Sequence, residues 1–331
     1  MVQYKKHYGS EIFMKIVILD AFAQNPGDLS WDFLDKYGET EIYDRTPPEL
    51  IYERSKDADI LVTNKTPLTG EMIDSLPKLK FVCTLATGYN VVDADKLKER
   101  SIPLSNIPAY STHAVAQLVF SFMLEHCTHV SLHSESVRRG DWSKNPDFTY
   151  HLTPLYELDG KTIGIIGFGR IGKDVAKKAH AFGMRTLVYA PRIHPGAQDY
   201  IEYTDLDTLL ASSDFVTLHC PLTKETTGLV NKEFLGKMKK SAFLINTSRG
   251  PVVNSKDLAG ALNNSVIAGA GLDVMTKEPP EKNDPLLAAK NCIITPHIAW
   301  AALETRQRLM DIFEENIKAF CSGHPINVVN L

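Results

Sequence analysis

The feature that most constrains the fold is a glycine-rich turn between an apolar segment and an amphipathic one. Residues 162–166 (TIGII) have the composition of a buried strand, and apolar residues recur at helical spacing after the turn. In such a turn the first glycine permits the tight bend, the second lets the backbone approach a pyrophosphate, and the third lets helix and strand pack closely. The helix N-terminus then faces the anion with free N–H groups. The pattern predicts a dinucleotide site formed by Gly167, Gly169, Arg170, Ile171 and Gly172.

Strand candidates around this turn alternate with helical segments. They lie at residues 162–166, 186–189, 215–219, 242–246, 268–273 and 292–295. Six strands with intervening helices predict a doubly wound, Rossmann dinucleotide-binding lobe. Before it, four strand candidates alternate with polar helical stretches at residues 15–19, 41–43, 59–62 and 80–83, which indicates a second parallel-sheet α/β lobe.

A chain of 331 residues is too long for one ordinary domain. We expect residues 14–111 and 298–331 to form the substrate lobe, residues 112–297 the nucleotide lobe, and residues 1–13 an extension. Ser111 is the expected cap of a long helix, and residues 301–321 are expected to form a final one. Residues 138–159 are expected to form a long loop with a subunit contact around Trp142.

Charge and cysteine content exclude several classes of protein. A net charge of −4 gives no general attraction to nucleic acid or to an anionic membrane. The five cysteines are odd in number and scattered, which favours reduced thiols, and no metal-binding pattern occurs. The N-terminus lacks the apolar core of a signal peptide, and the longest apolar stretch is too short to span a bilayer. The expected location is the cytoplasm.

The acidic residue that usually meets the adenosine ribose is missing. Its position at the end of the strand 186–189 holds Ala190, and Arg192 follows closely. Without the carboxylate nothing repels a 2′-phosphate, and Arg192 could pair with one. A solvated Arg192 with NAD held by other contacts remains the alternative, so the sequence leaves NAD and NADP open.

Three polar residues follow predicted strands of the nucleotide lobe, namely Arg249, Glu278 and His297. Ligands of open α/β sheets bind beyond the carboxyl ends of the strands, so all three could face one cleft. Taken singly, each also has an ordinary explanation as a solvated arginine, a solvated glutamate before proline, or a structural histidine.

The chain resembles the D-isomer-specific 2-hydroxyacid dehydrogenases from about residue 15 to residue 327. Beyond the glycine turn, the matching segments are 86–90 (ATGYN), 106–112 (NIPAYST), 219–222 (HCPL), 246–250 (NTSRG) and 295–297 (TPH). Residues 25–31 and Trp300 are most like the glycerate dehydrogenases, also called hydroxypyruvate reductases. The resemblance implies a flavodoxin-like substrate lobe, a homodimer, and hydride transfer between NAD(P) and C2 of a small D-2-hydroxy or 2-keto acid, with D-glycerate and hydroxypyruvate as the expected pair.

The resemblance also implies catalytic roles. Arg249 would bind the substrate carboxylate and polarise the C2 oxygen, and His297 would donate a proton to that oxygen. Glu278 would orient His297 and favour its protonated form. Backbone N–H groups around Thr87 and Gly88 would complete the carboxylate site.

Further family positions map onto the cofactor. Thr112, Pro221, Thr226 and Thr247 would contact its phosphates, ribose or nicotinamide. Asp273 would accept a hydrogen bond from the carboxamide, although an aspartate that closes a strand can simply cap the next turn.

Other functions stay open at this point. The substrate could be D-lactate, 3-phosphoglycerate or a phenylpyruvate. A binding protein that senses NAD(H), like corepressors that resemble this family, is an alternative from another class. The presence of Arg249, Glu278 and His297 together favours an enzyme. A Tyr-x-x-x-Lys pattern at Tyr52 and Lys56 lies far ahead of the glycine turn and is interpreted as coincidence.

Overall fold

A computed structural model describes residues 14–192 and 198–331, which form two compact units. One contains the chain up to Tyr110 together with Ala301–Leu331, and the other is Ser111–Trp300. The chain therefore passes between the units twice, after Tyr110 and after Trp300; the sequence placed these crossings after residues 111 and 297. The extension proposed for residues 1–13 lies outside the described residues.

The first unit, hereafter the substrate unit, is built on a five-stranded parallel sheet of order β2-β1-β3-β4-β5. This is the flavodoxin-like order. Four of these strands were predicted, and β5 was missed. The strands are β1 (Met14–Ile18), β2 (Gly38–Ile42), β3 (Ile60–Thr63), β4 (Phe81–Thr84) and β5 (Leu104–Ser105).

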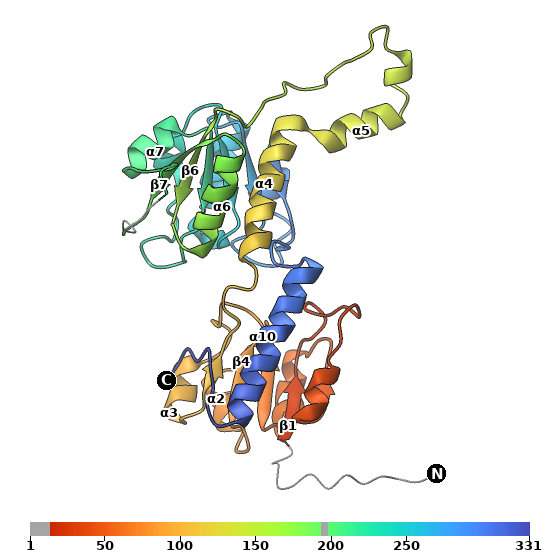
Figure 1. The fold of residues 1–331 in the computed structure, drawn as a ribbon, viewed down its shortest axis with the longest axis vertical. Helices are drawn as coiled ribbons and strands as arrows, with labels where there is room; N and C mark the ends of the chain where they lie inside the picture. The colour runs from red at the N-terminus through yellow and green to blue at the C-terminus, as the bar shows by residue number, and fades with distance from the viewer. Residues whose placement is uncertain (1–13, 193–197) are drawn as a thin grey trace. The chain divides into compact units, whose positions relative to one another are not determined.

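Helices cover both faces of this sheet. The long C-terminal helix α10 (Leu303–Cys321) lies across β4 in Figure 1, where Phe320 stacks on Phe81 with ring centroids 4.4 Å apart. Apolar side chains of the short helices α1, α2 and α3 join a separate buried cluster with Val17, Leu61 and Val82. The helices besides α10 are η1 (Asp32–Lys36), η2 (Pro48–Leu50), α1 (Ile51–Ser55), α2 (Gly70–Asp74) and α3 (Ala94–Glu99).

The second unit, hereafter the nucleotide unit, contains a seven-stranded parallel sheet of order β12-β11-β10-β9-β6-β7-β8. The strand order reverses between β6 and β9, as in a doubly wound dinucleotide fold. The prediction of six strands was short by one, because the edge strand β8 was missed. The strands are β6 (Thr162–Ile166), β7 (Arg185–Tyr189), β8 (Ile201–Tyr203), β9 (Phe215–Leu218), β10 (Phe243–Asn246), β11 (Gly269–Leu272) and β12 (Cys292–Ile294).

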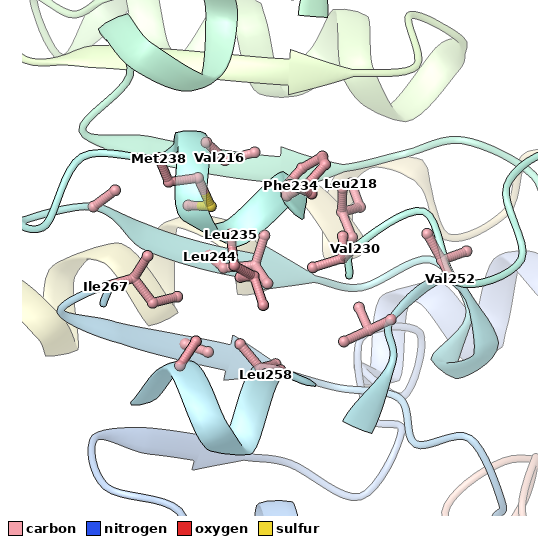
Figure 2. Packing of buried hydrophobic residues seen from close by; sticks show 14 of the residues in the cluster. Val216, Leu218, Val230, Phe234, Leu235, Met238, Leu244, Val252, Leu258 and Ile267 are labelled. Atoms are coloured by element: carbon pink, nitrogen blue, oxygen red, sulfur yellow. The ribbon is translucent and has the colours of Figure 1, made fainter. Parts of the chain in front are cut away.

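The nucleotide sheet has a core on each face. On one face α4 and α6 pack on the strands, and Gly271 of β11 leaves room for the ring of Phe122 from α4. On the other face α7, α8 and α9 bury the cluster drawn in Figure 2. The long helix was predicted, but the Ser111 side chain forms no capping hydrogen bond. The helices are α4 (Thr112–Thr128), α6 (Arg170–Ala181), α7 (Leu206–Ser212), α8 (Lys232–Lys237), η4 (Gly250–Val252), α9 (Ser255–Asn263) and η5 (Pro285–Ala288).

One segment extends away from the body of the nucleotide unit. Helix α5 (Val130–Arg138) leads into η3 (Trp142–Lys144) and an irregular stretch that returns to β6, and Figure 1 shows this arm projecting from the unit. Trp142 is half exposed and its indole N–H donates to the Phe148 carbonyl at 3.0 Å. None of the helices in the described part of the chain has the length and apolar character needed to cross a membrane.

Candidate active site

The glycine turn has the geometry that a bound pyrophosphate requires. Gly167 has φ of +93°, and a Cβ there would lie 2.6 Å from the backbone of His219 and Cys220. By contrast, apart from its chain neighbours, no described residue has an atom within 4 Å of the position that a Gly169 Cβ would take. Helix α6 begins at Arg170 without a side-chain cap. The first N–H groups of a helix have no partner within it, so these groups are left for a ligand in the open space above Gly169.

Other predicted cofactor residues lie at the same carboxyl edge of the sheet or at the start of α4. Thr112 is the first residue of α4, and Arg192 is exposed just after β7. The Thr226 hydroxyl donates to the Pro221 carbonyl at 2.7 Å, which closes the turn that follows β9. The Thr247 hydroxyl is buried and has no hydrogen-bond partner among the described residues. An orphaned hydroxyl at the carboxyl edge of the sheet that carries the glycine turn fits a dinucleotide bound at this edge.

The loop that carries Arg249 is held by a buried asparagine. Asn246, the last residue of β10, is fully buried. Its amide donates to the Arg249 carbonyl at 2.9 Å, and its oxygen accepts from the backbone and the hydroxyl of Ser248. Arg249 itself is exposed, and one guanidinium nitrogen donates to the Ser248 carbonyl at 2.7 Å. The backbone of this loop is thus fixed while the Arg249 side chain faces solvent.

His297 and Glu278 form a direct pair. The imidazole Nδ1 lies 2.7 Å from Oε2 of Glu278, and Oε1 of Glu278 accepts from the Met275 backbone N–H at 3.0 Å. Because a carboxylate accepts, the ring proton belongs on Nδ1, which leaves Nε2 available to exchange a proton with a ligand. The side chains of His297 and Glu278 are about one-third exposed, at 31% and 35%.

A buried carboxylate holds the His297 loop. Asp273 is almost fully buried, and its oxygens accept from the Thr295 hydroxyl at 2.6 Å and from the N–H groups of Ile298 and Ala299 at 2.8 and 2.9 Å. Burial raises the pKa of the Asp273 carboxyl, and the three hydrogen bonds oppose that rise. His297, enclosed by these contacts, has a left-handed φ of +56°. The carboxamide contact that the family implies for Asp273 stays a prediction.

The loops after neighbouring strands meet at one edge of the sheet. Strands β10, β11 and β12 are adjacent, and a Cβ on Gly250 would collide with the backbone of Met275 and Thr276. The Arg249 loop therefore contacts the Glu278 loop. Sequence reasoning gave Asn246 no site role; its place at the end of a strand, beside a candidate arginine, was the available signal.

Thr87 and Gly88 belong to the substrate unit, just after β4. The Thr87 hydroxyl donates to the Ile107 carbonyl at 2.9 Å, and its own carbonyl accepts from the Asn106 amide at 2.8 Å. This loop therefore has a fixed backbone, as a site made of N–H groups needs.

His219, near the glycine turn, is a second histidine, and its environment distinguishes it from His297. His219 Nε2 lies 3.0 Å from the Thr217 hydroxyl, and burial lowers the pKa of His219 to about 3. Its ring is therefore neutral and unsuited to give up a proton near pH 7. Within residues 14–192 and 198–331, no three histidine, cysteine or acidic side chains are grouped as a metal site would require.

The family model for the NAD binding domain of D-isomer specific 2-hydroxyacid dehydrogenases matches residues 120–299, which is more than half of the chain. The chain belongs to this family. A hydroxypyruvate reductase of Blautia hydrogenotrophica is 50% identical over 321 residues, which span 96% of this chain and 100% of that relative. A glycerate dehydrogenase of Methylorubrum extorquens is 41% identical over 318 residues, 95% of this chain and 98% of the relative.

Among solved structures, this dehydrogenase is similar to an acyclic imino acid reductase in complex with NADPH and D-Arg. The TM-score is 0.81 and the identity 33%, over 96% of this chain and 100% of the other. The predicted family, the two parallel-sheet lobes and an NAD(P)-dependent 2-hydroxyacid dehydrogenase activity are therefore confirmed. These relatives are named for catalytic activities, so a sensor of NAD(H) is not favoured.

Proposed function

We propose that this dehydrogenase reduces hydroxypyruvate to D-glycerate and catalyses the reverse oxidation. The names of the two relatives reported above support this pair of substrates. The observation that carries the catalytic proposal is the 2.7 Å His297–Glu278 pair, on a loop edge shared with Arg249. A bound nicotinamide would supply the hydride that reaches C2 of the acid.

In this proposal each side chain has a distinct task. Arg249 binds the carboxylate through its guanidinium fork and polarises the C2 oxygen. His297 delivers a proton from Nε2 to that oxygen during reduction and takes it back during oxidation. Glu278 keeps the proton on Nδ1 and balances the positive charge that the ring carries. Backbone N–H groups near Thr87 and Gly88 are the further donors to the carboxylate in this proposal.

Steady-state kinetics with a panel of acids tests the assignment. Loss of NADH absorbance is measured with hydroxypyruvate, glyoxylate, pyruvate and phenylpyruvate, and hydroxypyruvate is expected to give the highest kcat/KM. A higher value for pyruvate or phenylpyruvate would reassign the substrate. Tight NADH binding without turnover of any acid would favour a sensor instead.

We propose further that the enzyme accepts NADPH as well as NADH. Ala190 is partly buried at the end of β7, and Arg192 is exposed two residues later. A 2′-phosphate at this edge meets no carboxylate from the position that normally repels it, and Arg192 is available to pair with it.

Ala190→Asp should shift the enzyme toward NADH. The new carboxylate would accept from the ribose hydroxyl and repel a 2′-phosphate, a difference of about 1.5–3 kcal/mol or about 10- to 100-fold in the kcat/KM ratio. Tyr189→Phe, at the exposed neighbouring residue, is the matched control. Unchanged use of NADPH by Ala190→Asp would show that this position does not face the ribose.

The arm formed by residues 130–156 supports a homodimer, which is also proposed. It exposes several large apolar side chains: Val130, Leu132, Val137, Trp142, Phe148, Leu152, Leu155 and Tyr156. Phe148 is 88% exposed, and large apolar side chains left exposed in such number mark interaction sites.

Light scattering during gel filtration checks the dimer. The wild type is expected at twice the 36.9 kDa of one chain, and Phe148→Asp with Trp142→Ala at the mass of one chain. Leu287→Asp, which alters an exposed leucine in η5, should leave the mass unchanged. A monomeric wild type at micromolar concentration would refute the proposal.

We place the enzyme in the cytoplasm and assign it no nucleic-acid or membrane partner. All five cysteines are free thiols, which suits a reducing compartment, and the net charge of −4 offers no electrostatic attraction to phosphate polymers.

A further inference from the structure

The first turns of helix α10 contact the backbone beside both crossings between the units. Arg308 Nε donates to the carbonyl of Tyr110, the last residue before the first crossing, at 3.1 Å. Arg306 Nε donates to the carbonyl of Ala301, the first residue after the second crossing, at 2.9 Å. Two arginines separated by one residue on a single helix therefore hold the two places where the chain leaves and re-enters the substrate unit.

Arg306 is fixed by a second set of contacts. Its side chain is buried, and its two terminal nitrogens donate to the two oxygens of Asp28 at 2.7 and 2.6 Å. It also donates to the Gln24 carbonyl at 3.1 Å. Asn25 braces the same loop by accepting from the N–H groups of Gly27 and Leu29. A bidentate ion pair fixes the direction of the guanidinium as well as its distance. Because Arg306 also holds the Ala301 carbonyl, it ties the second crossing to the loop that follows β1.

Arg308 holds the first crossing in a similar way. A terminal nitrogen donates to the hydroxyl of Thr305, which is buried. Ala109, immediately before the residue that Arg308 contacts, has φ of +60°. A non-glycine residue remains in that conformation only where its surroundings hold it.

We propose that Arg306 and Arg308 are positioning residues that keep both crossings attached to the start of α10 during turnover. Hinges are residues at the ends of elements that absorb backbone rotation, and they often limit kcat. With both carbonyls held by one helix, backbone rotation at the crossings is confined to the few residues beyond the anchors. If either carbonyl is released, the backbone rotation spreads into more residues of that crossing, and we expect turnover to slow.

The test compares Arg306→Met, Arg308→Met and the double variant with the wild type. Gln307→Ala is the matched control, since Gln307 lies between the two arginines, is exposed, and contacts Asp311 on the outside of the helix. Hydrogen exchange is followed in peptides covering residues 106–113 and 298–305. Affinity for NADH is measured by fluorescence. Steady-state kinetics give kcat and KM for whichever keto acid the wild type reduces.

Each arginine variant is expected to exchange about tenfold faster at its own crossing, with the strands of both sheets unchanged. The kcat should fall about tenfold or more, while NADH affinity stays within about twofold. The double variant should lose more than either single variant. Gln307→Ala should match the wild type in all measurements.

Several results would overturn the proposal. Faster exchange at the crossings with unchanged kcat would show that the anchors do not act in turnover, and unchanged exchange would show that they do not hold the crossings. If Arg306→Met loses hydrogen-exchange protection throughout the substrate unit, that variant has destabilised the fold. The proposal is then tested by Arg308→Met alone, because Arg308 is only partly buried. The kinetic measurements depend on the proposed function, whereas the hydrogen-exchange measurements do not. If the wild type reduced none of the acids, the proposed function would fail, and the exchange data would still test whether the arginines hold the crossings.

Discussion

His297→Gln is expected to lower kcat for hydroxypyruvate reduction by about 10²- to 10⁴-fold, the usual contribution of a positioned acid. Glutamine is similar in length and can still hydrogen-bond Glu278, but its amide is far too weak an acid to donate a proton. The glycine turn and Thr247 lie on other loops, so NADH affinity should stay within about twofold. Single-turnover absorbance measurements with saturating NADH separate the proton-dependent step from binding.

Glu278→Gln supplies the comparison for this prediction. Its single amide oxygen can accept from Nδ1 of His297 or from the Met275 N–H, but not from both, and the substitution removes the negative charge that balances a protonated ring. Its kcat should fall less than that of His297→Gln. If His297→Gln instead abolished NADH binding and left the rate of the bound fraction intact, the acid role assigned to His297 would be wrong.

Arg249→Ala is expected to raise KM and lower kcat together. Two charge-assisted hydrogen bonds to the substrate carboxylate, at about 1.5–3 kcal/mol each, predict a loss of about 10²- to 10⁴-fold in kcat/KM. Because Arg249 is exposed and its one side-chain hydrogen bond within the described structure is to the adjacent Ser248 carbonyl, its removal should hardly change the melting temperature. Steady-state kinetics and thermal melting of the same sample check both expectations.

Arg249→Lys refines the result. Lysine keeps the charge but presents a single ammonium in place of the planar fork, so it should recover part of KM and little of kcat. Lys256→Ala, at an exposed cation in α9, controls for the general loss of positive charge. Wild-type kinetics in Arg249→Ala would remove this residue from the site.

Much of the nucleotide unit could be predicted because its signals are local. The glycine turn combines an apolar strand, three glycines at fixed spacing and an amphipathic helix within about twenty residues, and β6 begins and ends where the sequence placed it. Residues that follow parallel strands share one edge of a sheet, so alternation alone placed Arg249, Glu278 and His297 at the same edge.

The missed features depend on contacts distant in sequence. β5 has two residues and β8 has three, too few to show any period, and their pairing with β4 and β7 identifies them as strands. Asp273 holds a loop about twenty-five residues further along the chain, and no local pattern marks that partnership. The anchoring arginines of α10 likewise contact Asp28 and Tyr110, which are far away in sequence.

The catalytic pair has a consequence for how this enzyme can diversify. Glu278 and His297 lie on the same sheet as the glycine turn, so one continuous stretch, Ser111–Trp300, carries the dinucleotide fingerprint and the proposed proton-transfer machinery. If Thr87 and Gly88 complete the proposed carboxylate site, residues of the other unit can change the range of acids bound while the proposed acid–base pair stays unchanged. Substrate range and reactivity can then evolve separately, because the two units are joined by the polypeptide at only two places.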